Sequence, residues 1–116
     1  MKQLRVAVVG TGMGKNHIRT FQAHKRATVV AVCSTSQVRA DASAEEFGIA
    51  RSYGDYARML DDDRIDAVCI TTHPGAHAEL SAAVLRSGRH VMCTKPLGVD
   101  LGEARGLLDI ASSSGL

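Results

Sequence analysis

The fold is decided by one stretch near the start of the chain, Leu4-Arg5-Val6-Ala7-Val8-Val9-Gly10-Thr11-Gly12-Met13-Gly14-Lys15. Its apolar run ends directly in glycines, which is typical of a parallel strand buried on both faces and followed by a tight turn. Gly10 allows the turn, and Gly12 lets a pyrophosphate approach the backbone. The helix that follows would direct its first N–H groups at that pyrophosphate. The stretch therefore predicts the first strand, turn and helix of a dinucleotide-binding unit.

The glycine spacing departs from the usual pattern. A dinucleotide-binding turn normally reads G-x-G-x-x-G, whereas the third glycine here comes one residue early and Lys15 occupies its usual place. A glycine pattern alone is weak evidence, because a strand-to-helix turn without a ligand uses the same residues. The interpretation therefore depends on the rest of the chain.

Strands and helices alternate along the whole sequence. We expect strands at 4–9, 27–33, 50–53, 65–71 and 90–93, and helices at 14–24, 37–47, 55–60, 76–87 and 101–111. This alternation predicts an α/β fold, a doubly wound parallel (Rossmann) sheet of about five strands in the order 3-2-1-4-5, forming one domain over 1–116. The acidic run Asp61–Asp63 is interpreted as a solvated turn.

Polar loops follow the predicted strands at the end where a doubly wound sheet binds its ligand. They are Gly10–Lys15, Ser34–Ser36, Thr71–Gly75 and Thr94–Pro96. Because the carboxyl ends of parallel strands meet at one edge, these loops should converge on one crevice. Four converging loops support a ligand site far better than one glycine turn.

The composition of the chain limits the classes of partner that we expect. The 116 residues carry a formal net charge of +2 with two Phe, two Tyr and no Trp, so neither a basic surface nor stacking side chains favour nucleic acid. No apolar stretch is long enough to span a membrane, and no signal peptide is recognised. Cys33, Cys69 and Cys93 lie in or beside apolar runs, which predicts reduced thiols in a cytoplasmic protein.

The chain resembles the N-terminal domain of the Gfo/Idh/MocA family of nicotinamide-dependent oxidoreductases over nearly its whole length. The resemblance is carried by the stretches Val9–His17, Asp66–Pro74, His77–Leu80 and His90–Leu97. The last stretch contains a Lys-Pro pair that the family usually precedes with Glu. Here Thr94 takes the place of that Glu, while Lys95 and Pro96 are present.

The resemblance implies roles for matched positions. Lys95 would lie near the nicotinamide and the substrate hydroxyl, where its ammonium group favours alkoxide character during hydride transfer, and it is the candidate catalytic residue. The candidate cofactor-binding residues around the pyrophosphate are Gly10, Thr11, Gly12, Met13 and Gly14. Those on the ribose and nicotinamide side are Thr71, Thr72, His73, Pro74, His77, Lys95 and Pro96.

The preference for NAD or NADP depends on the residues at the end of the second predicted strand. NAD-binding folds usually place Asp or Glu there for the ribose 2′-OH, but this chain has Ser34, Thr35 and Ser36, with Arg39 on the next helix. Hydroxyl groups and a guanidinium can bind a 2′-phosphate by donating hydrogen bonds to it, whereas a carboxylate would repel it. The sequence therefore slightly favours NADP, although the same serines also suit a helix cap.

Family members continue into a second domain that supplies most substrate contacts. The resemblance therefore implies a cofactor domain that transfers hydride to or from a sugar, polyol or related small molecule only when a substrate domain is supplied. The alternatives are a non-catalytic dinucleotide-binding or assembly module and a non-enzymatic fragment. A fifth strand at the sheet edge and apolar positions on the last helix predict self-association.

Three further features have simpler interpretations. His73 and His77 have a metal-like spacing, but Pro74 and Gly75 intervene and no third ligand is evident, so no metal site is expected. The three cysteines are interpreted as small buried apolar residues. His17 is expected to pack on the first helix.

Overall fold

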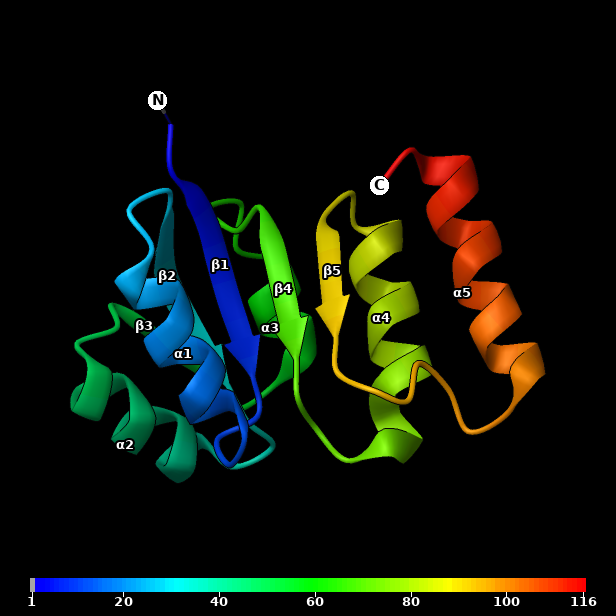
Figure 1. Ribbon diagram of the computed structural model, residues 1–116. Helices are drawn as coiled ribbons and strands as arrows, with labels where there is room; N and C mark the ends of the chain where they lie inside the picture. The colour runs from blue at the N-terminus through cyan, green and yellow to red at the C-terminus, as the bar shows by residue number, and fades with distance from the viewer. Residues whose placement is uncertain (1) are drawn as a thin grey trace.

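The computed structural model describes residues 2–116, which form one parallel sheet in the order β3-β2-β1-β4-β5 (Figure 1). The strands are β1 (Leu4–Val9), β2 (Ala27–Cys33), β3 (Arg51–Tyr53), β4 (Ala67–Ile70) and β5 (His90–Cys93). The helices are α1 (Gly14–Ala23), α2 (Gln37–Phe47), α3 (Tyr56–Leu60), α4 (His77–Arg86) and α5 (Leu101–Ser114), with a 3₁₀ turn, η1 (Pro74–Ala76). The predicted doubly wound sheet and its strand order are confirmed.

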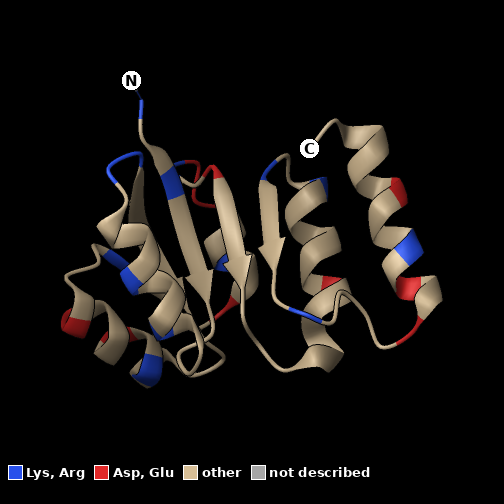
Figure 2. Cartoon of the chain, viewed as in Figure 1, with Lys and Arg blue, Asp and Glu red and all other residues tan. Residues whose placement is uncertain are grey.

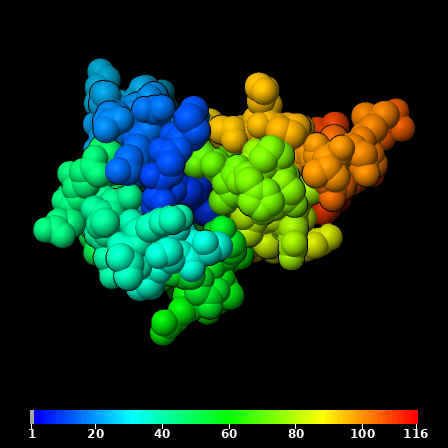
Figure 3. All heavy atoms as spheres, turned by 90° about the horizontal axis from the view of Figure 1, so that it is seen from below, coloured from blue at the N-terminus to red at the C-terminus, as the bar shows by residue number. Residues whose placement is uncertain are grey.

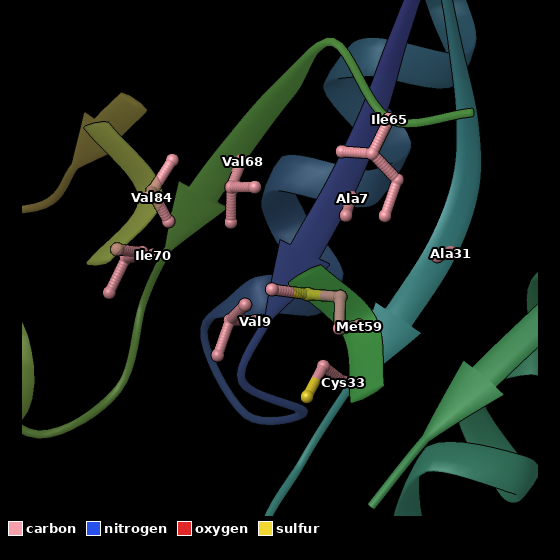
Figure 4. Packing of buried hydrophobic residues seen from close by; sticks show 9 residues of the cluster. All are labelled: Ala7, Val9, Ala31, Cys33, Met59, Ile65, Val68, Ile70 and Val84. Atoms are coloured by element: carbon pink, nitrogen blue, oxygen red, sulfur yellow. The ribbon is translucent and has the colours of Figure 1, made fainter. Parts of the chain in front are cut away.

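β1 lies in the middle of the sheet and pairs in parallel with β2 and β4. One apolar cluster lies on one face of the sheet and contains Val6, Val8, Ile18, Val29, Val32, Ile49 and Cys69. The cluster on the opposite face contains Ala7, Val9, Ala31, Cys33, Met59, Ile65, Val68, Ile70 and Val84 (Figure 4). Because successive strand residues enter different clusters, the sequence of β1 has no polar face.

Helix ends follow the capping residues expected from the sequence. The Ser36 hydroxyl accepts the Arg39 N–H at 3.3 Å at the start of α2, and Gly48 ends this helix with φ of +66°. α5 runs beyond the predicted end at Ala111 and stops before Gly115, which has φ of +73°. A glycine in the left-handed region is a common helix stop because it has no Cβ to clash.

The prediction of a solvated acidic turn is wrong at Asp62. Its side chain is only 2% exposed and accepts hydrogen bonds from Arg51 Nε at 2.7 Å, Arg64 Nε at 2.8 Å and the Tyr53 hydroxyl at 2.7 Å. These donors, Arg64 foremost, hold the pKa of Asp62 well below its usual range against the opposing effect of burial. Asp61 and Asp63 are exposed as expected.

The sheet edge formed by β5 is flanked by α4, and α5 packs beside α4 (Figure 1). Two leucines of α5, Leu101 and Leu108, remain 64% and 62% exposed. Lys and Arg are interspersed with Asp and Glu over the helices (Figure 2). Within residues 2–116, no helix has both the length and the apolar character needed to cross a membrane.

Candidate functional site

The polar loops meet at the carboxyl ends of the strands, the edge onto which Figure 3 looks. Backbone hydrogen bonds continue the sheet pairing into the loops. Gly10 N donates to Cys33 O at 2.9 Å, Thr71 N to Val9 O at 2.9 Å, and Thr94 N to Ile70 O at 3.1 Å. The spacing between the loops is therefore set by the sheet itself.

Gly10 and Gly14 are required by close packing against Thr71. Gly10 has φ of +110°, and a Cβ there would overlap Thr71 Oγ1. A Cβ on Gly14 would lie 3.0 Å from Thr71 Oγ1 and 3.2 Å from Val8 Cγ1. Gly14 thus allows the close helix–strand contact that the third glycine of a dinucleotide-binding turn provides, although it comes one residue early.

Gly12 differs from both neighbouring glycines, because nothing inside the protein requires it. It is exposed, its φ lies outside the left-handed region, and a Cβ would meet no atom within 4 Å. α1 begins two residues later without a side-chain cap, and the N–H groups of Gly12, Met13 and Gly14 have no acceptor among residues 2–116. Unpaired N–H groups beside an open backbone fit a pyrophosphate.

The end of β2 carries hydroxyl groups. Ser34 is buried and its Oγ accepts the Ser36 N–H at 3.2 Å, whereas Thr35 is exposed. The Arg39 side chain is exposed and forms no ion pair within the described part of the chain. The helix cap of α2 and an exposed cation in its first turn are thus present together.

The two histidines after β4 have different environments. His73 is exposed, and its Nδ1 accepts the Gly75 N–H at 3.1 Å, which caps η1. His77 is 1% exposed, and its ring lies between Thr72 O and Pro96 O. Across residues 2–116, no three His, Cys, Asp or Glu side chains gather to hold a metal ion.

Lys95 lies on the loop after β5 and is exposed, and the bond between it and Pro96 is cis. Thr94 Oγ1 donates to Ile70 O at 3.3 Å, so Thr94 joins the ends of β4 and β5 where the family usually has Glu. The ring of His77 reaches the same loop through Pro96. The site therefore combines an exposed cation with a loop anchored on both sides.

The thiols are protonated at neutral pH. Burial raises the pKa of Cys33 and of Cys69 to about 12, and burial also raises the pKa of Cys93. A thiol with a raised pKa is a poor nucleophile. Cys33 and Cys69 are buried as predicted, while Cys93 is only partly buried.

A hollow of about 820 Å³ lies away from these loops, at the amino ends of the strands. It is lined by Lys2, Leu4, Phe21, His24, Arg26 and His90, among other residues. The nearby Asp66 already pairs with Arg5 at 2.9 Å. The unpaired N–H groups and the convergence of loops favour the carboxyl ends of the strands as the candidate cofactor site instead.

Comparison with known proteins agrees with this geometry. The family model described as "Oxidoreductase family, NAD-binding Rossmann fold" matches residues 4–116. Inositol 2-dehydrogenase of Salmonella typhimurium is 32% identical over 97% of this chain and 34% of its own length. D-xylose 1-dehydrogenase (NADP(+)) 2 of Haloferax volcanii is 37% identical over 94% and 34%.

Solved structures show the same fold. GenD2 from gentamicin A biosynthesis, in complex with NAD, has a TM-score of 0.94 at 32% identity and covers all of this chain. A 3-ketoreductase from Actinomadura kijaniata, in complex with NADP, has a TM-score of 0.94 at 31% identity over 99% of the chain. The match covers 33% and 37% of those two proteins, so the chain spans about a third of the relatives' length.

Fold and site together define an NAD(P)-binding Rossmann domain. The chain belongs to the Gfo/Idh/MocA oxidoreductase family and corresponds to its N-terminal cofactor domain. The expected family is confirmed.

Proposed function

We propose that this domain holds NADP or NAD against the loops at the carboxyl ends of its strands, as the cofactor part of an enzyme that transfers hydride between the nicotinamide and a hydroxylated small molecule. One observation carries the proposal. Gly12 is exposed, has no special φ and faces open space, so a ligand that approaches the backbone explains the glycine where packing does not.

The bound nicotinamide would supply the hydride chemistry, and the residues of this chain would hold and orient it. The N–H groups of Gly12 and Gly14 would bind the pyrophosphate at the start of α1. Further candidate contacts lie on the loops after β1 and β4: Thr11, Met13, Thr72, His73 and Pro74. Lys95 is an exposed cation beside the candidate nicotinamide position, where it would stabilise negative charge developing on a substrate oxygen.

The substrate class is proposed from the relatives. Inositol 2-dehydrogenase and D-xylose 1-dehydrogenase are named for a polyol and a sugar, so a sugar or polyol is the proposed substrate of the complete enzyme. Substrate would then be bound with the help of a second domain. Three unpaired thiols fit a reducing compartment, which favours the cytoplasm.

We also propose that NADP is preferred. Ser34, Thr35 and Ser36 provide no carboxylate to repel a 2′-phosphate, and the Arg39 guanidinium is available to pair with it. The relatives include complexes with NAD and with NADP, so the preference rests on this chain's own residues.

A titration of the chain with NADPH and NADH, followed by nicotinamide fluorescence, tests binding. Gly12→Ala should weaken NADPH binding by about tenfold or more, or roughly 1.4 kcal/mol, and leave the free energy of unfolding within about 0.5 kcal/mol of the wild type. Absence of binding at millimolar cofactor would refute the proposal. Equal affinity in wild type and Gly12→Ala would refute the role of Gly12.

An assembly module is the second candidate. β5 forms an edge of the sheet, and the exposed Leu101 and Leu108 lie on α5. Edge strands and exposed apolar side chains favour association with another surface. We propose that copies of this domain associate through β5 or α5.

A further inference from the structure

His77 is the most enclosed polar side chain at the candidate site. It is 1% exposed, while Thr72 and Pro96, the two residues it contacts, both lie on loops that reach the surface. Its Nδ1 lies 2.6 Å from Pro96 O and its Nε2 lies 2.7 Å from Thr72 O. One buried ring therefore joins the loop after β4 to the loop after β5.

Both partners of the ring are backbone carbonyl oxygens, which can only accept hydrogen bonds. A neutral imidazole has one N–H, so its other nitrogen would direct a lone pair at a carbonyl oxygen. Only the doubly protonated ring donates to both loops. Hydrogen bonds from a charged donor are shorter and about twice as strong as those between neutral groups, in keeping with the two short distances.

The groups around His77 act in opposite directions on the charge of its ring. His77 is the first residue of α4, where the helix dipole disfavours a cation. Glu79, in the first turn of the same helix, has the opposite charge. His73 before η1, and Cys93 and Lys95 from the side of β5, are the other titratable groups on adjoining segments. Burial also disfavours the charged ring, whereas the two carbonyl acceptors, which can receive hydrogen bonds only, favour it.

We propose that His77, with both ring nitrogens protonated, is a positioning residue that ties the Thr72 loop to the Pro96 loop and thereby fixes Lys95 relative to the glycine turn. The role of Lys95 near a bound nicotinamide rests on the proposed function. The tie itself is a property of the protein without cofactor, so the two can be tested separately.

The protonation of the ring is tested by nitrogen-15 NMR of histidine-labelled wild-type chain without cofactor. The expected spectrum at pH 7 shows hydrogen bonded to both His77 ring nitrogens, with slow exchange. Assignment uses variants in which each of the other four histidines is replaced by Gln, so that the signals present in all four spectra belong to His77. A neutral ring, with one nitrogen free of hydrogen, would overturn the proposal even if His77→Gln fails to fold.

The tie is tested in His77→Gln, with His90→Gln as the matched control, because His90 is exposed at the opposite end of β5. A glutamine amide donates from one nitrogen and reaches one loop only. The backbone amides of Thr71 and Thr94 are hydrogen-bonded at the bases of the two loops and should exchange with deuterium at least about tenfold faster in His77→Gln. The dissociation constant of NADPH should rise about tenfold. His90→Gln should match the wild type in both measurements.

These outcomes distinguish the tie made by His77 from the proposed binding of cofactor. Unchanged amide exchange in a folded His77→Gln would overturn the tie whether or not cofactor binds. A wild-type chain that binds neither NADPH nor NADH would refute the proposed function, while the ring spectrum and amide exchange still decide the role of His77.

Discussion

The hydroxyl of Thr71 lies directly against the Cα of Gly10, and it is fixed there by donating to Val9 O at 2.8 Å. Any Cβ on Gly10 would overlap this oxygen, and the φ of +110° is one that other residues rarely adopt. Gly10→Ala should therefore lower the free energy of unfolding by about 3 kcal/mol, from strain and steric overlap together. Urea unfolding followed by circular dichroism measures the loss.

Gly106→Ala is the matched control, because Gly106 lies inside α5 and a Cβ there meets nothing within 4 Å. Helix propensity predicts a gain of about 0.5 to 1 kcal/mol. If Gly10→Ala proved as stable as Gly106→Ala, the contact with Thr71 would not constrain the turn.

Acid should remove the stability supplied by the Arg5–Asp66 pair. The Arg5 guanidinium binds both carboxylate oxygens, at 2.9 and 3.0 Å, and lowers the pKa of Asp66 to about 2. A carboxylate with a lowered pKa stabilises the fold above its unfolded pKa of about 3.9, and this contribution disappears as the pH falls towards 2. Because both side chains are partly exposed and screened by solvent, its size is about 1 kcal/mol or less.

The measurement compares wild type with Asp66→Asn in urea from pH 7 to pH 2. The wild type should be more stable by about 1 kcal/mol or less above pH 5, and the difference should shrink as the pH approaches 2. A constant difference across this range would show that the pair does not titrate with folding.

Replacement by Asn should destabilise the protein strongly at Asp62 and hardly at all at Asp63. Asp62→Asn removes the charge that pairs with Arg51 and Arg64 and should destabilise the fold by about 3 kcal/mol. Asp63→Asn, at an exposed neighbour, should stay within about 0.5 kcal/mol of wild type. Thermal unfolding of the two variants side by side distinguishes the buried carboxylate from the solvated one.

Local patterns predicted most of the fold because they reflect local causes. The apolar run of β1 follows from burial on both faces, and the ends of α2 follow from Ser36 and Gly48. The buried state of Asp62 was not predictable in this way. Its partners Tyr53 and Arg51 lie 9 and 11 residues away on β3, and only folding brings them to its carboxylate.

In the candidate site too, some features could be predicted from the sequence and others required the structure. The convergence of the loops follows from strand order, so the residues of the crevice could be proposed from sequence. The distinct roles of the glycines could not, because packing against Thr71 separates Gly10 and Gly14 from Gly12. The position of His77 also required the structure, since one partner, Pro96, is 19 residues away. No local signal marks either relationship.

Arg39 should discriminate between the two cofactors. Arg39→Gln removes an exposed cation from the first turn of α2 and should raise the dissociation constant of NADPH about tenfold, while that of NADH stays within about twofold. Ser34→Asp should reverse the preference by placing a carboxylate at the end of β2. Arg86→Gln, on an exposed residue of α4, is the control. Tighter binding of NADH than NADPH by the wild type would refute the preference.

Self-association should depend on the apolar side chains of α5. Leu101 and Leu108 are 64% and 62% exposed, and burying each in an interface would contribute about 1 to 2 kcal/mol. The double change Leu101→Lys and Leu108→Lys should shift the chain towards monomer, because buried lysines would have to lose hydration. Sedimentation velocity at 10 to 500 µM, roughly the range in which weak contacts populate, measures the shift.

Met92→Lys provides the complementary test at the sheet edge, since Met92 of β5 is 43% exposed. Lysine on an edge strand opposes strand pairing between chains. Dissociation by Met92→Lys alone would locate the contact at β5, and dissociation by the leucine changes alone would locate it at α5. A wild-type chain that stays monomeric at the highest concentration would show that neither surface binds a second copy, leaving cofactor binding as the function that these residues support.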